Sequence, residues 1–400
     1  MHIESFSIAV SDQALADLKR RLEATRFPDD FGNDDWRYGT PTAYLKTLVD
    51  YWLGDYDWRT AEREMNGFRH FRADIDGVPV HFIHQKSQAS GAIPLIVTHG
   101  WPWCFWDMRH IIGPLTDPAA HGGDPADAFD VIVPSLPGFG FSTPLRTPGI
   151  NWWRTADLWQ KLMTQGLGYE RYGASGGDWG ALVTAQLGHK YAASLYGVHM
   201  MHAIPLTLFN TERPWDITGG ALVPPAIRGE LREALHARQR RIASHVAVQV
   251  LDPQTLANGL NDSPAGLLSW LVERRRAWGD THGDVEARFP KEHLITTTML
   301  YWLTGSFHTS ARYYAEAARH PWTPSHDRMP AVEAPTGLTF LGGERDPAVD
   351  DPVAAFQASE RARVYNLHQV TSHPTGGHFG HYEEPGAVVD AIRCLFRALR

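Results

Sequence analysis

Residues 169–180 read Tyr-Glu-Arg-Tyr-Gly-Ala-Ser-Gly-Gly-Asp-Trp-Gly, and this stretch decides the fold. It predicts a short strand, a glycine-rich corner and a helix that continues through 181–187. Small residues on both sides of one reactive side chain allow a sharp, strained turn, which lifts that side chain above the edge of a sheet. The stretch is therefore interpreted as a nucleophile elbow.

Two registers of the elbow fit the sequence, one with Ser175 and one with Asp178 as the nucleophile. With Ser175 at the corner, the first helical turn would contain Gly176 and Gly177, and each glycine costs about 1 kcal/mol relative to alanine in a helix. With Asp178 at the corner, both glycines precede the helix. This difference favours Asp178, with Ser175 as a small residue at the end of the strand.

An aspartate nucleophile points to a particular reaction class. A carboxylate is a poor attacker of esters, but it can displace a leaving group from saturated carbon and form an alkyl ester. Halide and the oxygen of a strained epoxide are suitable leaving groups. A neutral histidine then activates the water that hydrolyses this ester.

The strand and helix patterns alternate around the elbow, as in a doubly wound α/β sheet. We expect an α/β-hydrolase fold with a mostly parallel sheet, a helical cap insert and an N-terminal wrapping extension. The extension is expected at 1–70 and the first part of the core at 71–204. The cap is expected at 205–330 and the second part of the core at 331–400.

In this architecture the acid and the histidine of a catalytic triad follow the nucleophile in the chain. His378 follows the last predicted strand and completes the order. Asp346 and Glu344 both follow the preceding strand, and we favour Asp346 because a loop beyond the strand end could turn it towards His378. The backbone N–H groups of Trp101 and Trp179 are the predicted oxyanion hole.

Composition narrows the class of protein. The 400 residues carry a net charge of -8, so the sequence has no excess of positive charge for binding nucleic acid. We expect no membrane anchor and a cytoplasmic location, because neither a signal peptide pattern nor an apolar run of ~18 residues is found. The 2 cysteines exclude a disulfide framework. We expect no cofactor and no metal, since the histidines and carboxylates form no closed ligand set.

Several motifs together resemble the microsomal-type epoxide hydrolases of the α/β-hydrolase superfamily. The N-terminal stretch 27–53 resembles the meander of that family, and the resemblance covers nearly the whole chain. The chain departs from membrane-bound members because we find no N-terminal anchor pattern. The matching motifs are His-Gly-Trp-Pro at 99–102, Pro-Ser-Leu-Pro-Gly-Phe-Gly at 134–140, Gly-Gly-Asp-Trp-Gly at 176–180, Leu-Tyr-Trp-Leu-Thr at 300–304 and Gly-Gly-His-Phe at 376–379.

The resemblance implies that two cap tyrosines bind and protonate the epoxide oxygen. One of them matches Tyr314, with Tyr313 as the register alternative. The position of the other holds His245, which is a departure from the family pattern. His245 either replaces the tyrosine as a donor or shapes an unusual substrate pocket. Alternatively, the ungapped residue count that places it there is off, or His245 is an exposed residue of the cap. The expected partners are a small apolar epoxide and water, and homodimer formation is left open.

We therefore expect an epoxide hydrolase that forms a covalent aspartyl ester and releases a vicinal diol. Three alternatives remain open at this point. A haloalkane dehalogenase-type hydrolase would use the same Asp-Asp-His set, and a serine esterase would use Ser175. The third is a non-catalytic protein that binds an apolar ligand, for which the altered position of His245 is the only support.

Overall fold

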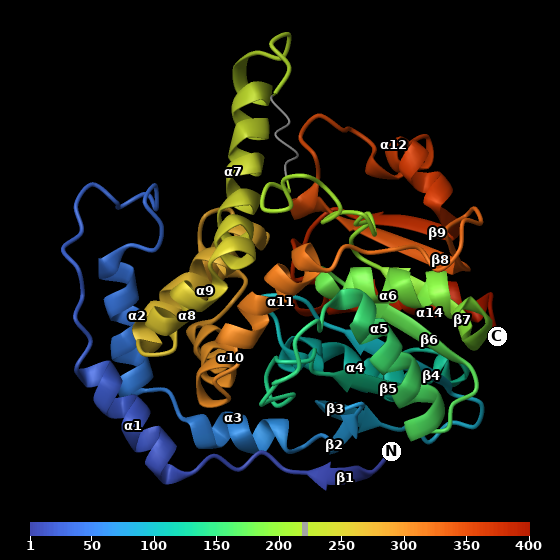
Figure 1. Cartoon of the computed structure of the whole chain (residues 1–400), viewed down its shortest axis with the longest axis horizontal. Coiled ribbons are helices and arrows are strands. Elements are labelled where there is room, and N and C mark those ends of the chain that lie inside the picture. The colour runs from blue at the N-terminus through green and yellow to red at the C-terminus, as the bar shows by residue number, and fades with distance from the viewer. Residues whose placement is uncertain (218–222) are drawn as a thin grey trace.

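The computed structural model describes residues 1–217 and 223–400, and the strands in these ranges form one nine-stranded sheet (Figure 1). The strands are β1 (Ile3–Phe6), β2 (His70–Ile75), β3 (Val78–Gln85), β4 (Ile93–Thr98), β5 (Phe129–Pro134), β6 (Tyr172–Gly176), β7 (Leu195–Met200), β8 (Val332–Leu341) and β9 (Tyr365–His373). Their order is β1-β2-β3-β5-β4-β6-β7-β8-β9. The strands from β5 to β9 are parallel, whereas β1, β2 and β3 are antiparallel. The predicted α/β-hydrolase fold with a mostly parallel sheet is confirmed.

Helices cover the sheet in two groups. The helices outside the cap are α1 (Asp12–Glu23), α2 (Thr42–Gly54), α3 (Trp58–Met65), α4 (Arg109–Thr116), α5 (Trp152–Lys161), α6 (Trp179–Lys190), α12 (Pro352–Gln357), α13 (Gly380–Glu383) and α14 (Pro385–Arg397). Helices α5 and α6 pack together on the central strands, and α4 and α14 form a second pair on the sheet.

Among the described helices, none combines the length and the apolar character that crossing a membrane requires.

Local signals in the sequence explain where several elements begin and turn. The hydroxyl of Ser11 accepts a hydrogen bond from the N–H of Ala14 and caps α1, as N-cap serines do. Asp76 and Gly77 have φ of 56° and 78° and join β2 to β3. Positive φ at both central residues is typical of the two-residue hairpin turn that matches the twist of the strands.

Among the described residues between β7 and β8, in the segment where we expected the cap, five α-helices are found. They are α7 (Gly229–Leu251), α8 (Pro253–Leu260), α9 (Pro264–Trp278), α10 (Lys291–Leu303) and α11 (Phe307–Arg319). The N-terminal helices α1 and α2 contact α9, and α2 also contacts α10 (Figure 1). An ion pair of 2.7 Å between Arg21 and Asp262 lies at this contact. The N-terminal segment therefore wraps around the cap rather than forming a separate unit.

A buried ion pair joins the cap to the loop that follows β4. The Oδ1 atom of Asp107 lies 2.8 Å from Nη1 of Arg275 on α9, and both side chains are almost fully buried. Arg275 also donates to the carbonyl of Pro102 at 3.2 Å. Burial alone would raise the pKa of Asp107, but Arg275 and His293 hold it well below its usual range. This carboxylate therefore stays charged inside the protein and depends on its partners.

We predict that Arg275→Met destabilises the protein by about 3–5 kcal/mol, because it leaves the Asp107 carboxylate buried without its main partner. Urea unfolding followed by tryptophan fluorescence measures the change. The matched control is Arg363→Met, which removes an exposed ion pair with Glu360 and should cost less than about 1 kcal/mol. Equal losses in the two variants would contradict a special role for the buried pair.

Candidate active site

Asp178 occupies the corner between β6 and α6 with φ of 53° and ψ of -123°. Non-glycine residues rarely adopt this backbone conformation, and strain of this kind is concentrated at functional sites. Close backbone contacts surround the corner, because a Cβ atom at Gly176 would lie 2.4 Å from the carbonyl oxygen of Gly180. A Cβ atom at Gly180 would lie 2.0 Å from the carbonyl oxygen of Thr98. The glycines therefore allow the turn that exposes Asp178.

Ser175 does not lie at the corner. It belongs to β6, is fully buried, and its hydroxyl lies 3.1 Å from Nδ1 of His199. Helix α6 begins at Trp179, directly after Asp178. The corner between β6 and α6 is thus occupied by Asp178, and Ser175 lies three residues earlier within the strand.

The two backbone N–H groups predicted for the oxyanion hole both contact the Asp178 carboxylate. The N–H of Trp101 donates to Oδ1 of Asp178 at 2.8 Å, and the N–H of Trp179 bonds the same carboxylate. Burial alone would raise the pKa of Asp178, but His378 and these two N–H groups lower it below its usual value. The carboxylate is therefore ionised at neutral pH.

Glu344 holds His378, which corrects our preference for Asp346. Oε1 of Glu344 lies 2.7 Å from Nδ1 of His378, and Nε2 of His378 lies 3.5 Å from Oδ2 of Asp178. The carboxylate of Asp346 instead accepts the N–H of Ala348 at 2.9 Å, within its own loop. The reason is the short turn at Gly342–Glu344, which follows β8 at once and keeps Glu344 at the sheet edge.

The charges around His378 fix its protonation in the free protein. Burial alone would lower the pKa of His378, but the carboxylates of Glu344 and Asp178 raise it to about 10. His378 is therefore a cation at neutral pH. Loss of charge on either carboxylate removes part of this stabilisation and lowers the pKa of His378.

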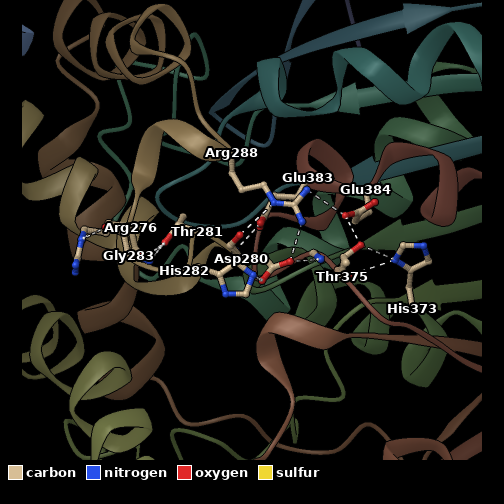
Figure 2. Close-up of polar contacts among 11 residues, drawn as sticks. Arg276, Asp280, Thr281, His282, Gly283, Arg288, His373, Thr375, Glu383 and Glu384 are labelled. Carbon is tan, nitrogen blue, oxygen red and sulfur yellow. Dashed lines mark hydrogen bonds and ion pairs between the residues drawn. The ribbon is translucent and has the colours of Figure 1, made fainter.

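The loop that carries His378 is tied to the end of α9 (Figure 2). The carboxylate of Asp280 accepts the N–H of Gly376 at 2.9 Å and a guanidinium N–H of Arg288 at 2.8 Å. The N–H of Asp280 donates in turn to Glu383 at 2.7 Å. These bonds join the cap to the histidine loop, so the position of His378 depends on the position of the cap.

His202 is a site residue that the sequence analysis missed. It follows β7 at the carboxyl edge of the sheet, and its Nδ1 accepts the backbone N–H of Asp178 at 2.7 Å. Its Nε2 lies 2.8 Å from Oε2 of Glu344, and its ring centre lies 4.6 Å from that of His378. A histidine directly beyond a parallel strand next to the elbow is the signal that could have identified it.

His202, Glu344 and His378 each have an atom that could bind a metal ion, and these three atoms lie within 4.8 Å of one another. Both oxygens of Glu344 already face ring nitrogens, and the second nitrogen of His202 accepts a backbone N–H. A metal would have to displace these hydrogen bonds. In this arrangement the three residues form a hydrogen-bonded chain rather than an open ligand set.

Tyr314 and His245 face the site from the cap. The Tyr314 ring on α11 lies 4.6 Å from the Trp179 ring, and the His245 ring on α7 stacks on Trp101 at 5.3 Å. The rings of His245 and Tyr314 lie 5.4 Å apart at 90°. Tyr313 points elsewhere, since its hydroxyl lies 2.7 Å from that of Thr155.

A cavity of about 620 Å³ connects these residues. Asp178, His378, Tyr314 and His245 all line it, together with apolar side chains that include Leu182, Ile242, Val246 and Phe209. Burial raises the pKa of Tyr314 well above its usual value and lowers that of His245 well below its usual value. Both cap groups are therefore neutral at neutral pH and can act as hydrogen-bond donors in an apolar chamber.

Comparisons with known proteins match the whole chain. Residues 3–108 match the family described as "Epoxide hydrolase N terminus", and residues 93–385 match the "alpha/beta hydrolase fold". A protein of Stigmatella aurantiaca (strain DW4/3-1), provisionally named an epoxide hydrolase, is 38% identical over 100% of this chain and 86% of the relative. Epoxide hydrolase 1 of Oryctolagus cuniculus is 31% identical over 99% of this chain and 89% of the relative. The crystal structure of juvenile hormone epoxide hydrolase from the silkworm Bombyx mori superposes with a TM-score of 0.79 at 28% identity, covering 100% of this chain and 94% of that chain.

We predict that Glu344→Gln lowers the pKa of His378 by about 1–3 units, because it removes the nearest negative charge that favours the imidazolium. Titration of the imidazole resonances by NMR measures this change from the wild-type value of about 10. Asp346→Asn is the matched control and should move the pKa of His378 by less than about 0.5 unit. A larger shift in Asp346→Asn than in Glu344→Gln would reverse our assignment of the carboxylate that holds His378.

Proposed function

Because the chain belongs to the epoxide hydrolase family of the α/β-hydrolase fold, we propose that it adds water to an epoxide and releases a vicinal diol. The nucleophile in this proposal is Asp178, and the product forms through a covalent aspartyl ester. The observation that carries the proposal is the position of the Asp178 carboxylate. It lies between two backbone N–H donors and 3.5 Å from His378, in a cavity that Tyr314 closes from the cap.

In the first step a carboxylate oxygen of Asp178 attacks an oxirane carbon. The carbon–oxygen bond of the ring breaks, and its electron pair moves to the epoxide oxygen. Tyr314 transfers a proton to that oxygen, while His245 supplies a second hydrogen bond from the cap. Burial raises the pKa of the Tyr314 phenol, which keeps it neutral, and a phenol can still protonate the far more basic alkoxide. The product of this step is a hydroxyalkyl ester of Asp178.

Ester formation removes the negative charge of Asp178, which is one of the two charges that keep His378 protonated. The proton that His378 carried in the free enzyme can then transfer to the Tyr314 phenolate, and this transfer restores the phenol. His378 is now neutral, with Glu344 still bonded to its Nδ1. In the free enzyme the charge of Asp178 helps to keep His378 protonated, so that it cannot act as a base. In the ester this charge is absent, and His378 can then accept a proton from water.

In the second step the neutral His378 takes a proton from water, and the hydroxide adds to the ester carbonyl carbon. The resulting oxyanion lies where the N–H groups of Trp101 and Trp179 already converge. Collapse of this intermediate breaks the bond to the substrate oxygen, which takes the proton of the added hydroxyl group and leaves as the second hydroxyl of the diol. One oxygen of the regenerated Asp178 carboxylate comes from water, and His378 is again a cation.

The alternatives fit the site less well. A serine esterase needs an accessible Ser175, but this side chain is fully buried within β6. A haloalkane dehalogenase-type reaction would use the same Asp178 and His378, yet it needs no acid for its leaving group, because halide leaves unprotonated. The neutral hydroxyl of Tyr314 in the cavity favours the epoxide. Halide release from a panel of haloalkanes tests this alternative directly.

We predict that His378→Gln traps the ester, because Asp178 can still attack while no base activates water. Intact mass spectrometry after incubation with styrene oxide should show the mass of protein plus substrate. In a single turnover in oxygen-18 water, the wild-type label should appear in a peptide that contains Asp178. Absence of the adduct, with the label delivered directly to the diol, would contradict the covalent scheme. Asp178→Ala is the blank.

We predict that Tyr314→Phe lowers kcat/KM by about 10²–10⁴-fold, because it removes the acid that protonates the departing oxygen. His245→Phe should lower kcat/KM less, by about tenfold, since it removes a hydrogen bond rather than the transferred proton. Steady-state diol formation measures both effects. Tyr313→Phe is the matched control and should retain activity within about threefold, because the Tyr313 hydroxyl bonds Thr155 outside the cavity. A larger loss in His245→Phe than in Tyr314→Phe would exchange the two roles.

A further inference from the structure

His202 connects the backbone of the proposed nucleophile to the acid of the triad. Its Nδ1 lies 2.7 Å from the backbone nitrogen of Asp178, and its Nε2 lies 2.8 Å from Oε2 of Glu344. The side chain is 10% exposed, so water competes little for either bond. No part of the proposed reaction steps uses this residue.

The two bonds fix the state of the His202 ring. A backbone N–H can only donate, so Nδ1 must be an unprotonated acceptor. The single proton of the neutral imidazole then lies on Nε2 and is donated to Glu344. Only one tautomer of the neutral ring satisfies both contacts. His202 therefore accepts a hydrogen bond from the backbone of Asp178 and donates one to the Glu344 carboxylate, and these two roles are not interchangeable.

The Glu344 carboxylate consequently accepts hydrogen bonds from two imidazole rings. One oxygen accepts from His378 and the other accepts from His202. Burial alone would raise the pKa of Glu344, but these two histidines hold it well below its usual range. Each additional N–H that a carboxylate accepts stabilises its charge and weakens its attraction for a neighbouring proton. The contact with His202 thus reduces the pull of Glu344 on the proton of His378.

We propose that His202 is a positioning residue with two separable effects, which rest on the proposed function. Its Nδ1 acceptor holds the strained backbone of Asp178 in the geometry for attack. Its Nε2–H donates to Glu344 and weakens the attraction of this carboxylate for the proton of His378. His378 therefore gives up its proton more readily and serves as a base at lower pH. The first effect acts on ester formation and the second acts on ester hydrolysis.

Other ionisable groups near this chain of bonds leave the proposal intact. Burial lowers the pKa of His199 to about 4 and that of His381 to about 3, so both are neutral at neutral pH. His245 is neutral for the same reason. Arg241 on α7 interacts with the charge of Glu344, and this cation is unchanged by substitutions at His202. Arg241 lies within electrostatic range of Glu344, His245 of Asp178 and His378, and His381 of His202. Arg238, Arg345 and Asp346 line the same cavity as Glu344, and substitutions at His202 leave them in place.

Two substitutions separate the two bonds. The amide oxygen of asparagine falls near the position of a histidine Nδ1, so His202→Asn can retain the acceptor for the Asp178 N–H and loses the donor to Glu344. The longer amide of glutamine reaches the position of Nε2, so His202→Gln can retain the donor and loses the acceptor. His368→Asn, at an exposed residue of β9, is the matched control.

The experiment is a rapid-quench single turnover of styrene oxide over a range of pH, with the ester detected by intact mass. In His202→Asn we expect the rate of ester formation to stay within about threefold of wild type. The rate of ester hydrolysis falls at acidic pH, and we expect the midpoint of this acid limb to move up by about one pH unit. NMR should show the pKa of His378 raised in this variant. In His202→Gln we expect the acid limb to stay in place and ester formation to slow by about tenfold.

Equal loss of both steps in the two variants, with no change in the acid limb, would overturn the proposal and leave His202 a purely structural residue. Wild-type behaviour of both variants would overturn it as well. These outcomes differ from a failure of the proposed function, in which no ester would accumulate even in His378→Gln. A thermal unfolding curve for each variant accompanies the kinetics, and NMR of His378 reports on Glu344 without any turnover.

Discussion

The site depends on a corner in the backbone at Asp178, where φ is 53°. Three glycines make room for it, because a Cβ atom at Gly176 or Gly180 would collide with neighbouring backbone and one at Gly100 would collide with the Asp178 side chain. The same corner directs the carboxylate towards the N–H of Trp101 and the ring of His378. Local strain is thus compensated by hydrogen bonds and by the buried helix α6 that follows.

Electrostatics at the site follow from burial combined with a few specific partners. Asp178, Glu344 and His378 lie in a mostly apolar surrounding where isolated charges would be unfavourable, yet each is held in its charged form by the others. Tyr314 and His245 lack such partners, and burial keeps both neutral. The cavity therefore combines a charged floor on the sheet with neutral donors on the cap, which suits a neutral substrate whose oxygen gains charge as it reacts.

Local signals predicted the features that depend on neighbouring residues in the chain. The glycines before Asp178 indicated the register of the elbow, Ser11 indicated the start of α1, and Asp76 with Gly77 indicated the first hairpin. The choice of Asp346 over Glu344 was wrong, because it depends on how a three-residue turn directs side chains towards a loop 34 positions away. His202 was missed because its role depends on contacts with two distant elements, and its place directly after β7 was the one signal of it in the sequence.

The bracing of the cap has a consequence for how the cavity exchanges its contents. Helix α9 is held by the Asp107 ion pair on one side and by the N-terminal helices on another, while Asp280 beyond its end is bonded to the histidine loop. A hinged swing of the cap as one rigid lid would break all three attachments together. Entry of a substrate does not call for such a swing, because the cavity also reaches the exposed residues Arg345 and Ala355, which lie outside the cap.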